Sequence, residues 1–140
     1  MLFNNWLAET YDLQHETYGY DLDGMNDAVM SPNLVRHRTP LVLVAKYLDW
    51  NTTAVVQEMA ELREEFSWKP WAVDEPFVNR ERIIAEAVDA LHFIGNMLVG
   101  VGCTDDELNE AYLAKMRINR ERQASGTYSA QKGGLALGSD

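Results

Sequence analysis

The stretch from Asn79 to Gly102 constrains the fold more than any other part of the chain. Asn79 is a favoured helix N-cap, and apolar residues then recur at helical spacing as far as Gly100 and Gly102, which favour a helix end. These apolar residues are Ile83, Ile84, Ala87, Val88, Leu91, Ile94 and Leu98. Because they wrap much of the helix, we expect it to lie at the centre of the fold.

Helices are also predicted in the N-terminal part of the chain. Aromatic and leucine residues at helical spacing predict a helix over about residues 5–18, and glycines follow it. Residues 21–38 mix Gly, Asn, Asp and Pro, which is typical of a loop or an irregular turn. Thr39 and Pro40 favour an N-cap and a first helical position, and so predict a helix over residues 41–50.

The rest of the chain contains two further predicted helices. The polar residues 51–53 favour the cap of a separate helix, whose apolar stripe ends near Phe66. Two prolines exclude a continuous helix over residues 68–78 and predict a loop there. A Thr-x-x-Glu capping box predicts a last helix over about residues 104–123.

These elements define the fold class and the domain organisation. No strand alternation or internal repeat occurs, so the sequence predicts an all-α helical bundle of about five helices. A chain of 140 residues predicts a single domain, which we place at residues 1–125. Residues 126–140 are rich in Ser, Gly, Ala and Gln, which predicts a flexible tail.

Composition narrows the classes of partner. The formal charge of −10 disfavours broad binding to nucleic-acid backbones and to anionic membrane surfaces. Cys103 is the lone cysteine and cannot form an internal disulfide, which favours a reducing compartment. We find no signal peptide and no apolar run that approaches membrane-spanning length. We therefore expect a cytoplasmic protein that binds neither nucleic acid nor membrane.

Two pairs of acids indicate metal chemistry. Glu58 and Glu61 lie three residues apart on one predicted helix, and Glu86 and Asp89 do so on another, so each pair projects from one helical face. A single acidic face is usually only solvated, but two faces on helices with core stripes would converge if those helices packed together. Glu65 extends the first face by another turn. Carboxylate oxygens are the ligands that Mg²⁺ prefers, and Mg²⁺ also binds substrate phosphates.

One face of the last predicted helix offers two cations and an amide. Lys115, Asn119 and Arg122 lie at positions i, i+4 and i+7. Arginine suits phosphate because its planar guanidinium donates several hydrogen bonds. On spacing alone, ordinary surface charge near a helix C-terminus is the better interpretation, because cations there favour the helix dipole.

Four ordered blocks of sequence extend these patterns. The blocks are Glu58-Met-Ala-Glu61, Phe66-Ser-Trp-Lys-Pro-Trp71, Glu86-Ala-Val-Asp89-Ala-Leu-His-Phe93 and the segment from Ala111 to Gln123. Together they resemble the all-α nucleoside triphosphate pyrophosphatases, specifically the dimeric dUTPase branch, over about residues 50–128. The resemblance implies Mg²⁺-dependent cleavage of a deoxynucleoside triphosphate to the monophosphate and pyrophosphate. It also implies a homodimer or a larger homo-oligomer.

The resemblance also implies roles for individual residues. The metal ligands would be Glu58, Glu61, Glu65, Glu86 and Asp89, with Glu61 as the general base. The phosphate-binding residues would be Lys69, Lys115, Asn119 and Arg122, and the base-binding residues would be Gln14, Trp71 and Phe93. His92 is expected to be a core or pocket histidine. The residues that follow Gln14 depart from the usual pattern of the family.

Three other interpretations stay open, and the departure after Gln14 favours the first of them. A MazG-like pyrophosphatase with broader dNTP specificity is the main alternative to a dUTPase. A ferritin-like di-iron bundle needs two Glu-x-x-His pairs, and only the segment from Asp89 to His92 comes near that pattern. A non-catalytic acidic protein that mimics nucleic acid would explain the charge of −10 but not the pattern of the acids.

Overall fold

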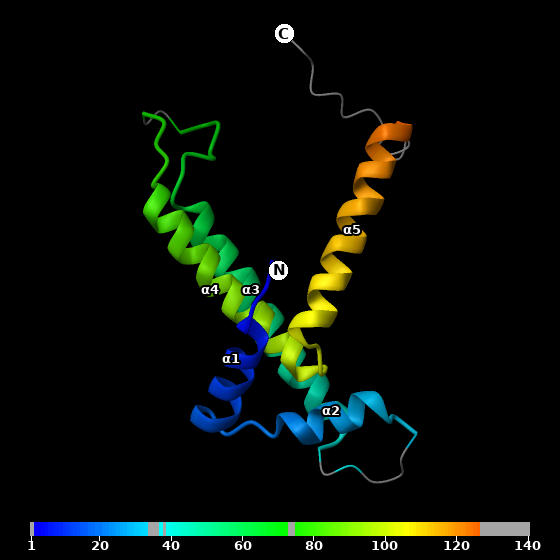
Figure 1. Cartoon of the computed structure of the whole chain (residues 1–140). Helices are drawn as coiled ribbons and strands as arrows, with labels where there is room; N and C mark the ends of the chain where they lie inside the picture. The colour runs from blue at the N-terminus through cyan, green and yellow to red at the C-terminus, as the bar shows by residue number, and fades with distance from the viewer. Residues whose placement is uncertain (1, 34–36, 38, 73–74, 127–140) are drawn as a thin grey trace. The chain divides into compact units, whose positions relative to one another are not determined.

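The computed structural model describes residues 2–33, 37, 39–72 and 75–126, and these form five α-helices (Figure 1). One compact unit, Asn5–Thr104, contains α1 to α4, and a second, Met1–Asn4 with Asp105–Asp140, contains α5. The described residues contain no β-strand beyond one isolated bridge. The predicted all-α class with about five helices is thus confirmed. The domain at 1–125 and the flexible tail stay predictions, and residues 127–140 lie outside the described part of the chain.

Helices α3 (Leu41–Arg63) and α4 (Arg80–Gly100) pack side by side and antiparallel (Figure 1). About one turn before the end of α4, Asn96 Nδ2 donates to Asn51 Oδ1 of α3 at 3.0 Å. The connection between the helices is closed by an antiparallel bridge between Phe66 and Val78, in agreement with the predicted loop. This hairpin of helices forms the frame on which the candidate site is built.

Helix α3 is continuous where the sequence predicted two helices. The polar side chains at 51–53 do not cap a new helix, because they bond to carbonyls one turn earlier in the same helix. Asn51 Nδ2 donates to Tyr47 O at 2.8 Å, and the hydroxyls of Thr52 and Thr53 donate to the carbonyls of Leu48 and Asp49 at 2.8 and 3.0 Å. Ser, Thr and Asn satisfied in this way can remain inside a helix. The predicted break was therefore wrong.

Helix α2 (Leu22–Met30) occupies a segment that the sequence predicted as a loop. The Asp21 carboxylate caps it by accepting from the Gly24 amide at 3.2 Å, and Thr39 Oγ1 donates to the same carboxylate at 2.8 Å. The buried apolar side chains of this helix are Leu22, Met25 and Ala28. A Cβ at Gly24 would meet Asp21 Oδ2 at 2.1 Å, so the glycine that suggested a loop is needed for close packing. Pro40, and not Thr39, is the N-cap of α3.

Helix α1 (Trp6–Asp12) continues as a π-helical turn, η1 (Leu13–Thr17), so the first predicted helix is confirmed with a change of winding at its end. It packs tightly on α4, because a Cβ at Gly95 would lie 3.1 Å from Trp6 Cζ2. Among the described residues, the buried apolar core consists of Leu7, Leu22, Met25, Ala28, Val44, Tyr47, Ala90 and Val99. Each of the helices α1 to α4 therefore contributes side chains to the core.

Helix α4 has the predicted boundaries. Asn79 Oδ1 accepts from the Arg82 amide at 3.4 Å, and Gly102 follows the helix with φ +78°. By length and composition α4 would also be able to cross a membrane, contrary to the expectation that no apolar run approaches that length. The core helix of a soluble protein passes the same test, and α4 packs against α1, α2 and α3. The absence of a membrane partner stays a prediction.

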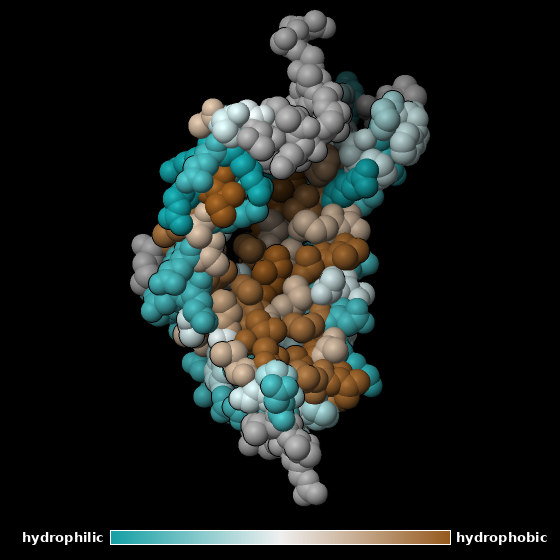
Figure 2. All heavy atoms as spheres, turned by 90° about the vertical axis from the view of Figure 1, so that its right-hand side faces the viewer, coloured by the Kyte–Doolittle hydropathy of each residue, from teal (hydrophilic) through white to brown (hydrophobic). Residues whose placement is uncertain are grey.

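A part of the apolar surface of α3 and α4 stays exposed. On α4 the exposed large apolar side chains are Ile84, Val88 and Leu91, which recur at helical spacing. On α3 the exposed large apolar side chains include Val56 and Met59. Figure 2 shows apolar side chains gathered on one face of the molecule. Large exposed patches of this kind mark surfaces that associate with another molecule.

The second unit is centred on α5 (Asp105–Ser125), whose ends agree with the predicted last helix. Asn109 is buried and ties the N-terminal segment to this helix. Its Oδ1 accepts from the amides of Leu2 and Phe3 at 3.1 and 2.9 Å, and its Nδ2 donates to Phe3 O at 2.7 Å. The Phe3 ring also packs edge-on against Tyr112.

Candidate functional site

Three acids from α3 and α4 form a cluster in the first unit. One carboxylate oxygen from each of Glu58, Glu86 and Asp89 lies within 4.8 Å of the others. Glu58 is half-buried, Glu86 is 4% exposed and Asp89 is exposed. The antiparallel packing of the helices thus brings together one acid from the first predicted pair and both acids of the second.

The cluster concentrates negative charge. The pKa of the Glu58 carboxyl is raised above its ordinary value by desolvation, then by the charges of Glu61, Asp89 and Glu86, and finally by a hydrogen bond with Glu86. Such repulsion is offset when a divalent cation binds among the acids. Carboxylate oxygens are hard ligands and fit Mg²⁺ better than a softer metal. The donor set therefore fits the metal that the resemblance implies.

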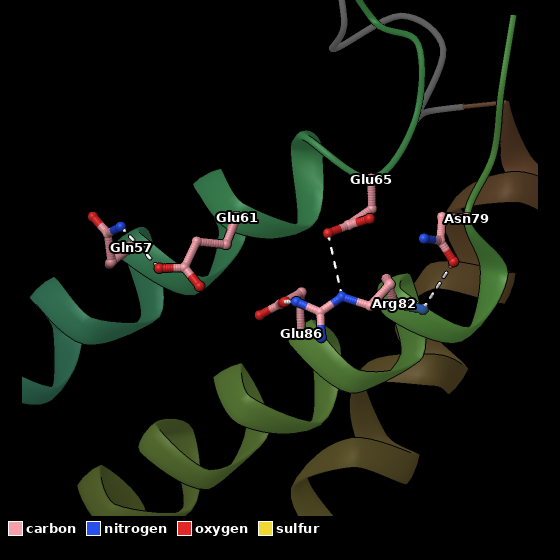
Figure 3. Close-up of polar contacts among 6 residues, drawn as sticks. All are labelled: Gln57, Glu61, Glu65, Asn79, Arg82 and Glu86. Atoms are coloured by element: carbon pink, nitrogen blue, oxygen red, sulfur yellow. Dashed lines mark hydrogen bonds and ion pairs between the residues drawn. The ribbon is translucent and has the colours of Figure 1, made fainter.

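Glu61 and Glu65, the other two predicted ligands, lie outside this three-acid cluster. Glu61 is exposed, and its Oε1 accepts from Gln57 Nε2 at 3.0 Å. Glu65 follows the end of α3, and its Oε1 lies 3.4 Å from Arg82 Nε (Figure 3). Their roles as ligands, and that of Glu61 as general base, stay predictions.

Sequence reasoning missed Arg82. Its Nη2 donates to Glu86 Oε1 at 2.6 Å in addition to the contact with Glu65 (Figure 3). The pairing of Arg82 with Glu86 could have been predicted from the sequence, because opposite charges at i and i+4 meet on a helix surface. The bridge to Glu65 could not have been predicted, because it depends on how α3 and α4 pack.

A cavity of about 390 Å³ lies beside the cluster. Its lining includes Ala54 of α3, one turn before Glu58, and Phe93 of α4, one turn after Asp89. The full lining is Thr10, Leu13, Gln14, Tyr18, Tyr20, Tyr47, Trp50, Asn51, Ala54, His92, Phe93 and Asn96. Two of the three predicted base-binding residues, Gln14 and Phe93, are therefore brought to one cavity, and His92 lies there too.

Polar groups of the cavity are held by hydrogen bonds that the sequence did not indicate. Gln14 is 5% exposed, and its Oε1 accepts from the Tyr47 hydroxyl at 2.8 Å. Burial, followed by the nearby Tyr20, raises the pKa of Tyr47, so its hydroxyl stays protonated and able to donate. Asn51 and Asn96 pair through their amides on the opposite helices. These contacts fix the polar groups in a cavity that is otherwise largely aromatic.

Trp71 is not among the residues that line this cavity. Its side chain is 69% exposed and packs edge-on against Trp68 in the connection between α3 and α4. The Arg63 guanidinium lies 3.6 Å from the centre of the Trp68 ring, and Lys69 Nζ lies 5.5 Å from it. The roles predicted for Trp71 with the base and for Lys69 with phosphate stay predictions.

The other predicted phosphate-binding residues lie on α5, in the second unit. Lys115 and Asn119 are exposed, and Arg122 is half-buried. Their spacing on one helical face is as the sequence indicated. Their contact with phosphate stays a prediction.

Comparison with known proteins gives one match. The family model described as dUTPase matches residues 23–101, which is more than half of the chain and includes α3, α4 and the acidic cluster. No curated protein and no solved structure matches the chain.

Glu58 provides a test of the charge within the cluster. Because the fold raises its pKa, the folded protein binds this proton more tightly than the unfolded chain, and the stability that the group contributes is lost as pH rises through the folded pKa. We expect metal-free Glu58→Gln to melt above the wild type at pH 7, with a difference that shrinks as the pH falls. Calorimetry in EDTA measures this, with Glu64→Gln as a control outside the cluster. A lower melting temperature for Glu58→Gln at pH 7 would contradict the assigned repulsion.

Proposed function

The chain belongs to the dUTPase family, and we propose that it is an Mg²⁺-dependent enzyme that hydrolyses dUTP to dUMP and pyrophosphate. The family supports a nucleotide pyrophosphatase in general. The observation that carries the specific proposal is the position of the cavity next to the acids. On α3 and on α4 alike, a residue that lines the cavity lies one turn from a carboxylate of the cluster.

The proposed division of labour follows from this arrangement. A base held in the cavity, with its deoxyribose and phosphates extending along the helices, would present the phosphates to the acids. Glu58, Glu86 and Asp89 would hold Mg²⁺, with Glu61 and Glu65 as further proposed ligands. When bound, Mg²⁺ would supply charge neutralisation for the phosphates and polarise a water molecule.

The reaction adds water across the α–β phosphoanhydride. A carboxylate oxygen of Glu61 is proposed to take a proton from the attacking water. The water oxygen becomes part of one phosphate product, and the bridging oxygen leaves with the other as the anhydride bond breaks. Lys69, Lys115, Asn119 and Arg122 are proposed to bind phosphate oxygens, which are common to all nucleoside triphosphates.

The base is proposed to be bound by Gln14, which reads its edge, and by Phe93, which stacks on it. The bond from Tyr47 to Gln14 Oε1 fixes the amide, so its NH₂ group is the part left to donate to a base carbonyl. Phe93 offers an aromatic face for stacking. Trp71 is retained as a proposed base contact on the resemblance alone.

We further propose that the enzyme is a cytoplasmic homodimer or larger homo-oligomer. The exposed apolar side chains of α3 and α4 support association, because a patch of this kind loses contact with water when a second surface covers it. The charge of −10 supports the proposed lack of nucleic-acid and membrane partners.

Hydrolysis is the first test. Purified protein with dUTP and Mg²⁺ is expected to release dUMP and pyrophosphate in equal amounts, detected by chromatography. Asp89→Asn, which removes a proposed ligand charge at constant size, should lower kcat/KM by at least about a hundredfold. Asp49→Asn on α3, which lies outside the cluster, is the matched control and should retain activity. Equal activity of both variants would refute the site.

Base selectivity separates the two candidate functions. A dUTPase is expected to have a higher kcat/KM for dUTP than for dTTP or dCTP. A close pocket rejects the methyl group of thymine, and the mismatched donors of cytosine would leave buried polar groups unpaired. Phe93→Ala should lower kcat/KM for all of these nucleotides by loss of stacking, because every base has an aromatic face. Trp71→Ala, measured in parallel, reports whether that exposed ring also contacts the base. Comparable kcat/KM values for dUTP and the purine dNTPs would instead favour the broader MazG-like pyrophosphatase, for which the departure after Gln14 is the supporting observation.

A further inference from the structure

Arg82, in the first turn of α4, joins two acids of the proposed metal site. Its Nη2 lies 2.6 Å from Glu86 Oε1, and its Nε lies 3.4 Å from Glu65 Oε1 (Figure 3). Glu86 lies one turn further along the same helix, whereas Glu65 lies just beyond the end of α3. One guanidinium therefore connects both helices beside the acidic cluster.

The surroundings of Glu86 make this contact important. The Glu86 side chain is only 5% exposed, and an ionised carboxylate at such a position is unfavourable unless it is paired. Arg82 is 56% exposed, so its guanidinium keeps much of its hydration while it forms the ion pair with the buried Glu86. A planar guanidinium also restrains the direction of its acceptors, which a lysine ammonium does not.

We propose that Arg82 is a positioning residue that fixes Glu86 for metal binding. This inference rests on the proposed function. The guanidinium holds Oε1 of Glu86 and restrains the rotation of its carboxylate, which leaves Oε2 to act as a ligand with Glu58 and Asp89. Groups that orient a metal ligand in this manner contribute about tenfold to a hundredfold to metal affinity.

A purely electrostatic effect of Arg82 would have the opposite sign. The positive charge beside the cluster repels a divalent cation, so its removal alone would tighten Mg²⁺ binding. This repulsion is screened by solvent because Arg82 is more than half exposed. We therefore expect that removal of Arg82 weakens Mg²⁺ binding more through the loss of Glu86 positioning than it strengthens binding through the loss of repulsion. The sign of the change in affinity distinguishes the two effects.

The test is Mg²⁺ affinity, measured by isothermal titration calorimetry on the full chain without nucleotide. Arg82→Ala is expected to weaken binding by at least about tenfold. Arg82→Lys keeps the charge but loses the planar guanidinium, so its Mg²⁺ affinity should lie between those of Arg82→Ala and the wild type. Arg80→Ala removes the same charge two positions earlier and should bind as the wild type does, because Arg80 forms no ion pair with either acid. Circular dichroism in EDTA checks that each variant is folded.

The outcomes separate the inference from the proposed function. Affinity of Arg82→Ala equal to or tighter than that of the wild type would overturn the positioning role while leaving the metal site in place. If Arg82→Ala does not fold, Arg82→Lys decides, and wild-type affinity in that variant would overturn the role. A wild-type protein that binds no Mg²⁺ and releases no pyrophosphate would instead refute the proposed function, and the positioning role with it.

Discussion

The antiparallel packing of α3 against α4 is the constraint on which the rest of the site depends. It aligns Asn51 with Asn96 and, two turns further along α3, sets Glu58 beside Glu86 and Asp89. One turn from Glu58 on α3 and from Asp89 on α4, Ala54 and Phe93 line the cavity. The acids oppose this packing through their repulsion, and the buried apolar side chains of the core offset that cost.

Much of this frame could be predicted from the sequence because its signals are local. Asn79 and Gly102, which follows α4, define the ends of the helix through side-chain capping and backbone conformation. The two acid pairs could be assigned to helix faces from spacing alone. Gln14 and Phe93 were indicated only by resemblance to a family, since nothing in their local sequence predicts that they share a cavity.

The errors have two physical causes, which are side-chain bonds made within a helix and contacts between segments that are distant in sequence. Residues 51–53 resemble a helix cap, but in the fold their side chains bond back within a continuous α3. Gly24 resembles a loop residue, but it lies in the first turn of α2, where the side chains of Asp21 and Thr39 leave no room for a Cβ. The pairing of Tyr47 with Gln14 and of Arg82 with Glu65 joins segments that are distant in sequence, so no local pattern indicates them.

We propose that α3 and α4 together form a site for a divalent cation. The most direct measurement is anomalous diffraction from crystals soaked in Mn²⁺, an ion that substitutes for Mg²⁺ at oxygen ligands and is visible by its own scattering. We expect an anomalous peak bound by carboxylate oxygens of Glu58, Glu86 and Asp89. Saturating Mn²⁺ that gives no peak among these residues, or a peak only elsewhere, would contradict it.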